Sequence, residues 1–116
     1  MTHPILHFEI VGKDQQLLEN FYRDVFDWKI ESVMPGYSLV DTGSGIGGGI
    51  GTSGNGASHV TFYVGVADIQ AAMATVERKG GTIAFGPQAI PDGGRIACFH
   101  DPEGHLIGLV QGPPGK

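Results

Sequence analysis

Apolar and polar residues alternate with a period of two over residues 5–11, the pattern of a strand with one buried face. Leu6, Phe8 and Ile10 fall on one side of this strand. His7 and Glu9 fall on the other side, together with Ile5 and Val11. The first predicted element therefore presents an imidazole and a carboxylate on the same face.

Beyond Gly12 the apolar period lengthens to that of an amphipathic helix. The stripe consists of Leu17, Leu18, Phe21, Tyr22, Val25 and Phe26. Asp14 precedes it and is placed to accept a hydrogen bond from a first-turn amide. Shorter runs with β propensity then predict strands over residues 28–34, 37–41 and 46–50.

The same order of patterns begins again at His59. Residues 59–64 alternate as the first strand does, Asp68 is a second candidate helix cap, and apolar residues follow at helical spacing until Gly80-Gly81. A strand near 82–85, a loop over 86–94 and a hairpin over 95–111 complete the chain. The hairpin turns at Asp101-Pro102-Glu103-Gly104, a sequence that favours a type I turn.

The repeat predicts an α+β fold made of two βαβββ modules, which we assign to residues 1–54 and 55–116. Each module opens with a histidine on its first strand, His7 or His59. Because neither module can bury its sheet alone, we expect the modules to pair, either within one chain or across a homodimer.

Residues 43–56 are dominated by glycine. A helix there would lose about 1 kcal/mol for each glycine relative to alanine, which excludes one. A short strand followed by a flexible joint is expected instead. This segment serves either as the rim of a ligand site or as a plain linker between the modules.

Composition narrows the class of partner. The chain has 116 residues and a net charge of −5, and its seven basic residues are scattered, so neither nucleic acid nor an anionic membrane surface is an expected partner. One cysteine and no secretory pattern favour the cytoplasm. We therefore expect a small-molecule partner.

Several motifs in this order resemble the vicinal oxygen chelate superfamily, which holds glyoxalase I, bleomycin-resistance proteins and extradiol dioxygenases. They are His-Phe-Glu-Ile at 7–10, the helical segment through Trp28, Ile-Gly-Gly-Gly at 46–49, Asp68-Ile69, Gly80-Gly81, and Phe99–Gly104 with the strand after it. The resemblance implies paired βαβββ modules with curved sheets around a cavity. In members that use a metal, it also implies ligands on the first and last strand of each module.

Carried onto this chain, the implied first-strand ligands are His7 and His59. The implied carboxylate positions hold glycine, at Gly108 in the second module and at Gly48 in the first. The chain therefore looks more like glyoxalase-related proteins of unsettled activity than like glyoxalase I.

Two interpretations of the histidines stay open. His7, Glu9 and His59 could supply a two-histidine, one-carboxylate set for zinc, nickel or iron(II). Alternatively, the same residues line a polar cavity that holds no metal.

Four further positions are candidates for contact with a substrate. Thr61 and Tyr63 share the His59 face, Arg95 lies at the mouth of the last hairpin, and Gly108 would leave space. Cys98 is expected to be a buried, inert thiol.

Two functions follow from these alternatives. The first is a binding protein that holds a small, partly aromatic molecule beside a degenerate metal site, as resistance-type relatives do. The second is a metal-dependent lyase, isomerase or dioxygenase, in which Glu9 acts as ligand or base. A dimerising accessory domain without a ligand is a third possibility.

Overall fold

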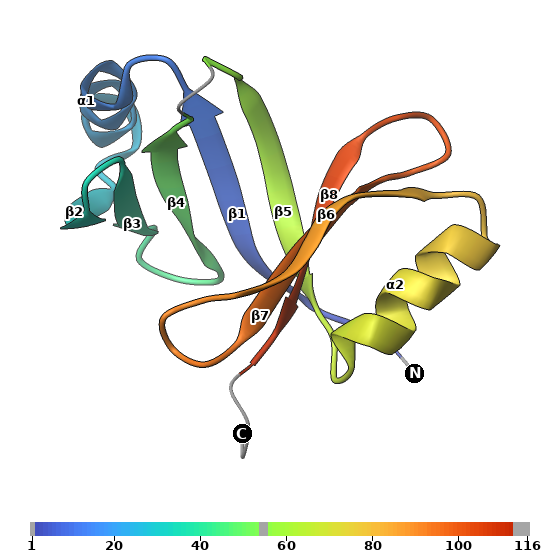
Figure 1. Cartoon of the computed structure of the whole chain (residues 1–116). Coiled ribbons are helices and arrows are strands. Elements are labelled where there is room, and N and C mark those ends of the chain that lie inside the picture. The colour runs from blue at the N-terminus through green and yellow to red at the C-terminus, as the bar shows by residue number, and fades with distance from the viewer. Residues whose placement is uncertain (1, 54–55, 113–116) are drawn as a thin grey trace. The chain divides into compact units, whose positions relative to one another are not determined.

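The structure is a computed structural model and describes residues 2–53 and 56–112. In chain order its elements are β1 (Ile5–Gly12), α1 (Gln15–Phe26), β2 (Lys29–Met34), β3 (Tyr37–Asp41), β4 (Gly47–Thr52), β5 (His59–Gly65), α2 (Ile69–Arg78), β6 (Thr82–Ala89), β7 (Arg95–His100) and β8 (Leu106–Gln111). Strand, helix and three strands thus occur twice, which confirms the predicted βαβββ repeat (Figure 1).

The chain divides into two compact units. One unit spans Leu6–Thr61, and the other contains the N-terminal residues up to Ile5 together with the chain from Phe62 onward. The predicted module boundary between residues 54 and 55 lies outside the described residues and stays a prediction.

In the Leu6–Thr61 unit the strands lie in the order β2-β3-β4-β1. β1 and β4 are parallel, with His7 opposite Gly47 and Glu9 opposite Gly49, and the other neighbours are antiparallel. Because side chains alternate along a strand, this register places His7, Glu9 and the odd-numbered glycines of β4 on one face. The opposite face carries Phe8, Ser38 and Ile50 and is covered by α1.

Helix α1 begins where predicted, since the Asp14 carboxylate accepts a hydrogen bond from the Leu17 amide at 3.0 Å. Its orientation differs from the prediction. Glu19 is the buried residue of the helix, whereas Leu17 and Phe21 of the expected core stripe are 66% and 55% exposed. The Glu19 carboxylate accepts hydrogen bonds from Ser38 Oγ at 2.7 Å and Gln15 Nε2 at 2.8 Å, so polar contacts fasten the helix to the sheet.

The other unit orders its strands β5-β8-β7-β6, with α2 packed against β6, β7 and β8 (Figure 1). Its core is formed by Ile69, Met73, Ala97 and Leu109. Asp68 caps α2 by accepting from the Ala71 amide at 3.1 Å, as expected. β6 extends to Ala89, so it includes part of the predicted loop.

The hairpin of β7 and β8 also has the expected turn. The Gly104 amide donates to the Asp101 carbonyl at 2.8 Å, and Asp101 Oδ1 accepts from the amides of Glu103 and His105. These backbone hydrogen bonds lower the pKa of Asp101. In the described part of the chain, no helix is long and apolar enough to cross a membrane.

Candidate functional site

The candidate site lies on the sheet face of the Leu6–Thr61 unit opposite α1. Three strands contribute to it: β1 carries His7 and Glu9, β3 carries Tyr37 and Leu39, and β4 between them carries alternate glycines. The middle strand therefore contributes no side chain of its own at these glycines, between two strands that bear side chains.

β4 is a paired strand, which confirms the strand predicted over residues 46–50 and extends it to Thr52. Its glycines allow aromatic rings to lie against the backbone. A Cβ on Gly51 would come within 2.9 Å of the Tyr37 ring, and one on Gly49 would overlap the Tyr37 hydroxyl. On the other face, a Cβ on Gly48 would be 2.5 Å from the Phe8 ring.

This register corrects the position implied for the first-module carboxylate. Gly48 is opposite Phe8 and faces α1, away from His7. Gly49, opposite Glu9, is the glycine on the face of the candidate site. The corner where an acidic side chain was considered missing is filled by the ring of Tyr37.

The Tyr37 hydroxyl joins the polar residues of this face into one network. It lies 2.9 Å from His7 Nε2 and is hydrogen-bonded to the Glu9 carboxylate. Glu9 Oε1 lies 3.5 Å from His59 Nε2. His7 and Glu9 therefore meet at the Tyr37 hydroxyl, and His59 lies beside Glu9.

Burial and charge determine the protonation of the network. Burial, the Glu9 charge and the Glu9 hydrogen bond together raise the pKa of Tyr37 above its ordinary value, so the hydroxyl keeps its proton. Burial lowers the pKa of His7, and the nearby Glu9 carboxylate only partly opposes this. His7 is consequently neutral at pH 7.

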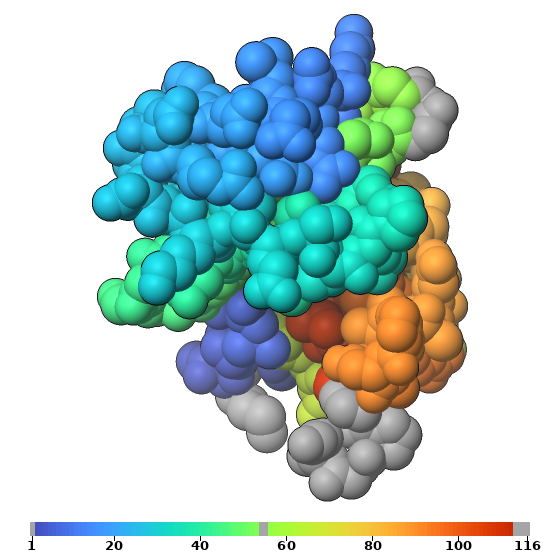
Figure 2. Space-filling view, turned by 90° about the vertical axis from the view of Figure 1, so that its left-hand side faces the viewer, coloured from blue at the N-terminus to red at the C-terminus, as the bar shows by residue number. Residues whose placement is uncertain are grey.

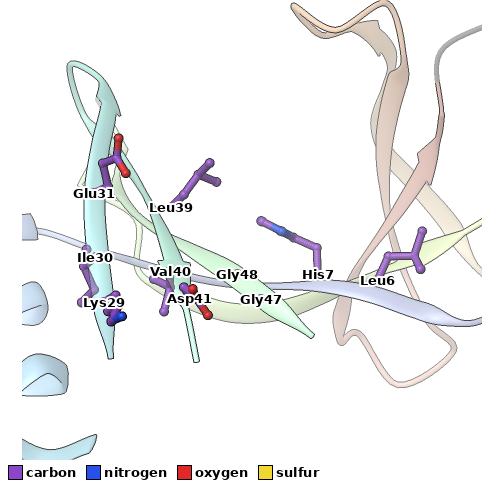
Figure 3. Close-up of a pocket in the computed structure, with 10 residues that line it drawn as sticks. All are labelled: Leu6, His7, Lys29, Ile30, Glu31, Leu39, Val40, Asp41, Gly47 and Gly48. Carbon is purple, nitrogen blue, oxygen red and sulfur yellow. The ribbon is translucent and has the colours of Figure 1, made fainter. Parts of the chain in front are cut away.

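A cavity of about 730 Å³ opens beside this network (Figure 3). It is lined by Leu6, His7, Lys29, Ile30, Glu31, Leu39, Val40, Asp41, Gly47 and Gly48. His7 and Leu39 project from β1 and β3 on the same side of the sheet and lean toward one another across β4. A Cβ on Gly47 would lie 2.8 Å from the backbone oxygen of Val40, and among the described residues other than its two chain neighbours no side-chain atom lies within 4 Å of that point.

The residues of this face do not fit a divalent metal ion. Such an ion requires at least three converging donors. Within residues 2–53 and 56–112, no three His, Cys, Asp or Glu side chains are arranged to hold one. His7 and Glu9 instead bind the Tyr37 hydroxyl.

The other candidate residues lie elsewhere or deeper. The ring of Tyr63 covers Gly108, so the space predicted there is filled. Tyr63 and Thr61 are both buried, and the Tyr63 hydroxyl lies 3.9 Å from Cys98 Sγ. Arg95 is half-buried at the start of β7. Contact of these residues with a ligand stays a prediction, whereas burial of Cys98 is confirmed.

Sequence reasoning missed Tyr37. A usable signal was present, because Gly47, Gly49 and Gly51 recur with the period of a strand and so clear one face of it. An aromatic residue on a neighbouring strand is the expected occupant of such a face. Only the register between β3 and β4 identifies Tyr37 as that residue, and the hydrophobic pattern of the sequence does not predict this register.

A model of the Glyoxalase/Bleomycin resistance protein/Dioxygenase superfamily matches residues 4–109. No curated protein sequence matches the chain.

Solved structures show the same fold. A methylmalonyl-CoA epimerase from Mycobacterium tuberculosis is 18% identical with a TM-score of 0.71, covering 95% of this chain and 88% of that one. A hypothetical protein from Bacillus halodurans is 15% identical with a TM-score of 0.73, covering 100% and 99%. A Streptomyces coelicolor methylmalonyl-CoA epimerase variant in complex with 2-nitronate-propionyl-CoA is 21% identical with a TM-score of 0.65, covering 98% and 97%.

Proposed function

Because the chain belongs to the Glyoxalase/Bleomycin resistance protein/Dioxygenase superfamily, we propose that it binds a small, partly aromatic molecule on the glycine floor of the β1–β4 sheet, without a metal ion. The open backbone at Gly47 carries this proposal. It lines the cavity together with His7 and Leu39. A Cβ there would meet the backbone oxygen of Val40 at 2.8 Å, and no side chain of the described residues, other than those of its two chain neighbours, is found within 4 Å of that point.

The protein itself shows how a flat ring fits this floor. Tyr37 lays its ring against Gly51 and Gly49, where any Cβ would collide with it. Gly47 is the next glycine of β4 on the same face and has no such ring. A planar ligand placed there would contact peptide groups below and the side chains of His7 and Leu39 at its edges.

Charge at the rim favours a neutral or cationic ligand. Lys29 contributes one positive charge, and Glu31 and Asp41 contribute two negative charges. Since burial keeps His7 neutral, the rim carries a net charge of about −1 at pH 7. An anionic ligand would therefore meet repulsion that its cationic counterpart does not.

The test compares two ligands that share one ring system, the naphthylmethylammonium cation and the naphthoate anion. We expect the cation to raise the melting temperature more than the anion, with the same shift in the presence of EDTA. A shift abolished by EDTA would favour the metal-dependent enzyme over the binding protein. Methylmalonyl-CoA belongs in the same panel, because two of the similar structures are named for its epimerisation.

Leu39→Ala removes one wall of the cavity, and we expect it to weaken binding of the cation several-fold. Val60→Ala is the control, since Val60 is an exposed apolar residue outside the cavity lining and outside α1. Equal affinities of the two variants would contradict the proposed site.

We also propose that the protein forms a homodimer through α1. The helix leaves Leu17, Phe21, Val25 and Phe26 more than half exposed. Figure 2 shows the helix segment, in blue, at the molecular surface. Exposed apolar residues grouped on one helix are typical of a protein–protein contact.

Sedimentation velocity tests the dimer with Phe21→Asp. We expect this variant to shift the protein toward monomer, whereas Gln16→Asp, an equal change of charge at an exposed polar position of α1, leaves the dimer intact. A wild-type chain that stays monomeric at every concentration would overturn this proposal. The cytoplasmic location favoured by the single cysteine stays a prediction.

A further inference from the structure

The Tyr37 hydroxyl lies where His7 and Glu9 converge. β1 places these two residues on one face, two positions apart, and the tyrosine ring reaches them from β3 across Gly51 and Gly49. The hydroxyl is 2.9 Å from His7 Nε2 and hydrogen-bonded to Glu9. One oxygen atom thus contacts both an imidazole and a carboxylate.

The direction of these hydrogen bonds follows from the number of protons. An ionised carboxylate only accepts, so the one proton of the Tyr37 hydroxyl is donated to Glu9. The hydroxyl oxygen then accepts from His7, whose Nε2 must carry a hydrogen. A protonated Nε2 has no lone pair to offer a cation.

We propose that the Tyr37 hydroxyl takes the place of a metal ion in this protein, holding His7 and Glu9 by hydrogen bonds at the point where they would otherwise coordinate. Tyr37 is then a positioning residue that fixes the ring of His7 at the wall of the cavity. The inference adds to the proposed function, but its metal test needs no ligand and can fail independently of it.

The chemistry of the donor side chains supports the replacement of a metal ion by the Tyr37 hydroxyl. Imidazole, carboxylate and a second imidazole from His59, 3.5 Å from Glu9, form the type of set that binds first-row divalent cations. With the hydroxyl between them, two of these three donors are already engaged. Glycine at position 49 is the condition for this arrangement, because a Cβ there would overlap the hydroxyl.

The first experiment uses the native protein. Nitrogen-15 NMR of the histidine rings is expected to show His7 as the neutral Nε2–H tautomer, unchanged when Zn²⁺ is added to millimolar concentration. A saturable shift of the His7 ring at micromolar Zn²⁺, or an Nδ1–H tautomer, would overturn the proposal.

The second experiment removes the tyrosine. We expect Tyr37→Ala, which releases His7 and Glu9 and opens space above Gly49, to bind Co²⁺ at least about tenfold more tightly than the wild type, with cobalt absorption bands of imidazole ligation. The double variant Tyr37→Ala, His7→Ala should lose this gain. A folded Tyr37→Ala protein with unchanged Co²⁺ affinity would refute the proposal.

Tyr37→Phe separates the hydroxyl from the ring. It retains the ring above Gly49 and Gly51 but removes the shared oxygen, so His7 loses its partner at Nε2. We expect the nitrogen-15 spectrum of His7 to become a mixture of tautomers, whereas a hydroxyl with only a packing role would leave it unchanged.

Discussion

The contact of an aromatic ring with a glycine backbone defines the candidate site at the scale of single residues. Tyr37 lies against Gly49 and Gly51, Phe8 against Gly48, and Tyr63 against Gly108. Each ring occupies the space that a Cβ on its glycine would need. Glycine is therefore required at these positions for packing, whatever its conformational freedom.

We predict that Gly49→Ala destabilises the protein by about 1–3 kcal/mol, because the added methyl group overlaps the end of Tyr37. Urea denaturation measures the change. In a Tyr37→Ala background the same substitution should cost much less, so a double-mutant cycle reports the contact. Additive costs would show that Tyr37 does not lie over Gly49.

The lowered pKa of His7 predicts a pH dependence of stability. Burial disfavours the imidazolium form in the folded protein, so below pH 6.5 the unfolded chain binds a proton before the folded chain does. Stability should therefore fall as the pH decreases from about 6.5 toward the folded pKa of His7. Tyr37 and Glu9 both act on this ring, the first by a contact of 2.9 Å and the second by its charge.

Denaturation between pH 7 and pH 5 checks this prediction. His7→Gln, which keeps a side chain able to hydrogen-bond but does not titrate, should show a shallower fall than the wild type. Parallel curves for the two proteins would contradict it.

The sequence was sufficient to predict which residues of β1 share a face, because strand periodicity alone determines this. It did not predict that Tyr37 joins His7 to Glu9, because that contact depends on pairing with β4. Vacant space at Gly108 was wrongly predicted for the same reason: the missing Cβ was noted, but not the ring of Tyr63 opposite it.

At the scale of elements, helix α1 shows how a hydrophobic pattern misleads. Its boundaries and its Asp14 cap were predictable from local chemistry. Its orientation was not, because the sheet beneath it offers Ser38, a fully buried hydroxyl that needs a partner. Glu19 supplies that partner, so this polar residue of α1 faces the sheet beside the half-buried Leu18 and Tyr22.

We predict that Glu19→Ala destabilises the protein by about 1–3 kcal/mol, because it leaves the Ser38 hydroxyl buried without its acceptor. Leu17→Ala should change the free energy of unfolding by less than about 0.5 kcal/mol, since Leu17 is 66% exposed and alanine favours the helix. Urea denaturation at a protein concentration where the chain is monomeric measures the free energy of unfolding of both variants. A larger cost for Leu17 would mean that its side chain is buried in the monomer.

At the scale of the whole molecule, the repeat of strand, helix and three strands made the fold predictable. Each half has its own cap aspartate and its own fully buried isoleucine, Ile50 in one unit and Ile69 in the other. The fold was predictable because both halves show the same order of hydrophobic periods, first that of a strand, then that of a helix, then those of strands. The extent of β4 and β6 was less predictable, since glycine and proline within them suggested loops.

We predict that Ile69→Ala lowers the free energy of unfolding by about 2–5 kcal/mol through loss of core packing. Native-state hydrogen exchange should show the larger loss of protection in β6, β7 and β8, the strands packed with α2. Ile50→Ala is the matched substitution in the other unit and should affect β3 and β4 most. Equal loss of protection at every amide in both variants would show that the chain opens as a single cooperative body.

The backbone surface that Gly47 contributes to the cavity limits how selectivity among ligands can change. Peptide groups are the same in every protein, so no substitution at Gly47 can retune this surface except by covering it. New preferences would have to arise at the margin, through Lys29, Glu31, Leu39 and Asp41, while the platform beneath stays constant. Homologous proteins with this glycine strand would therefore change their ligand preference by substituting the side chains around it, while the backbone surface stays the same.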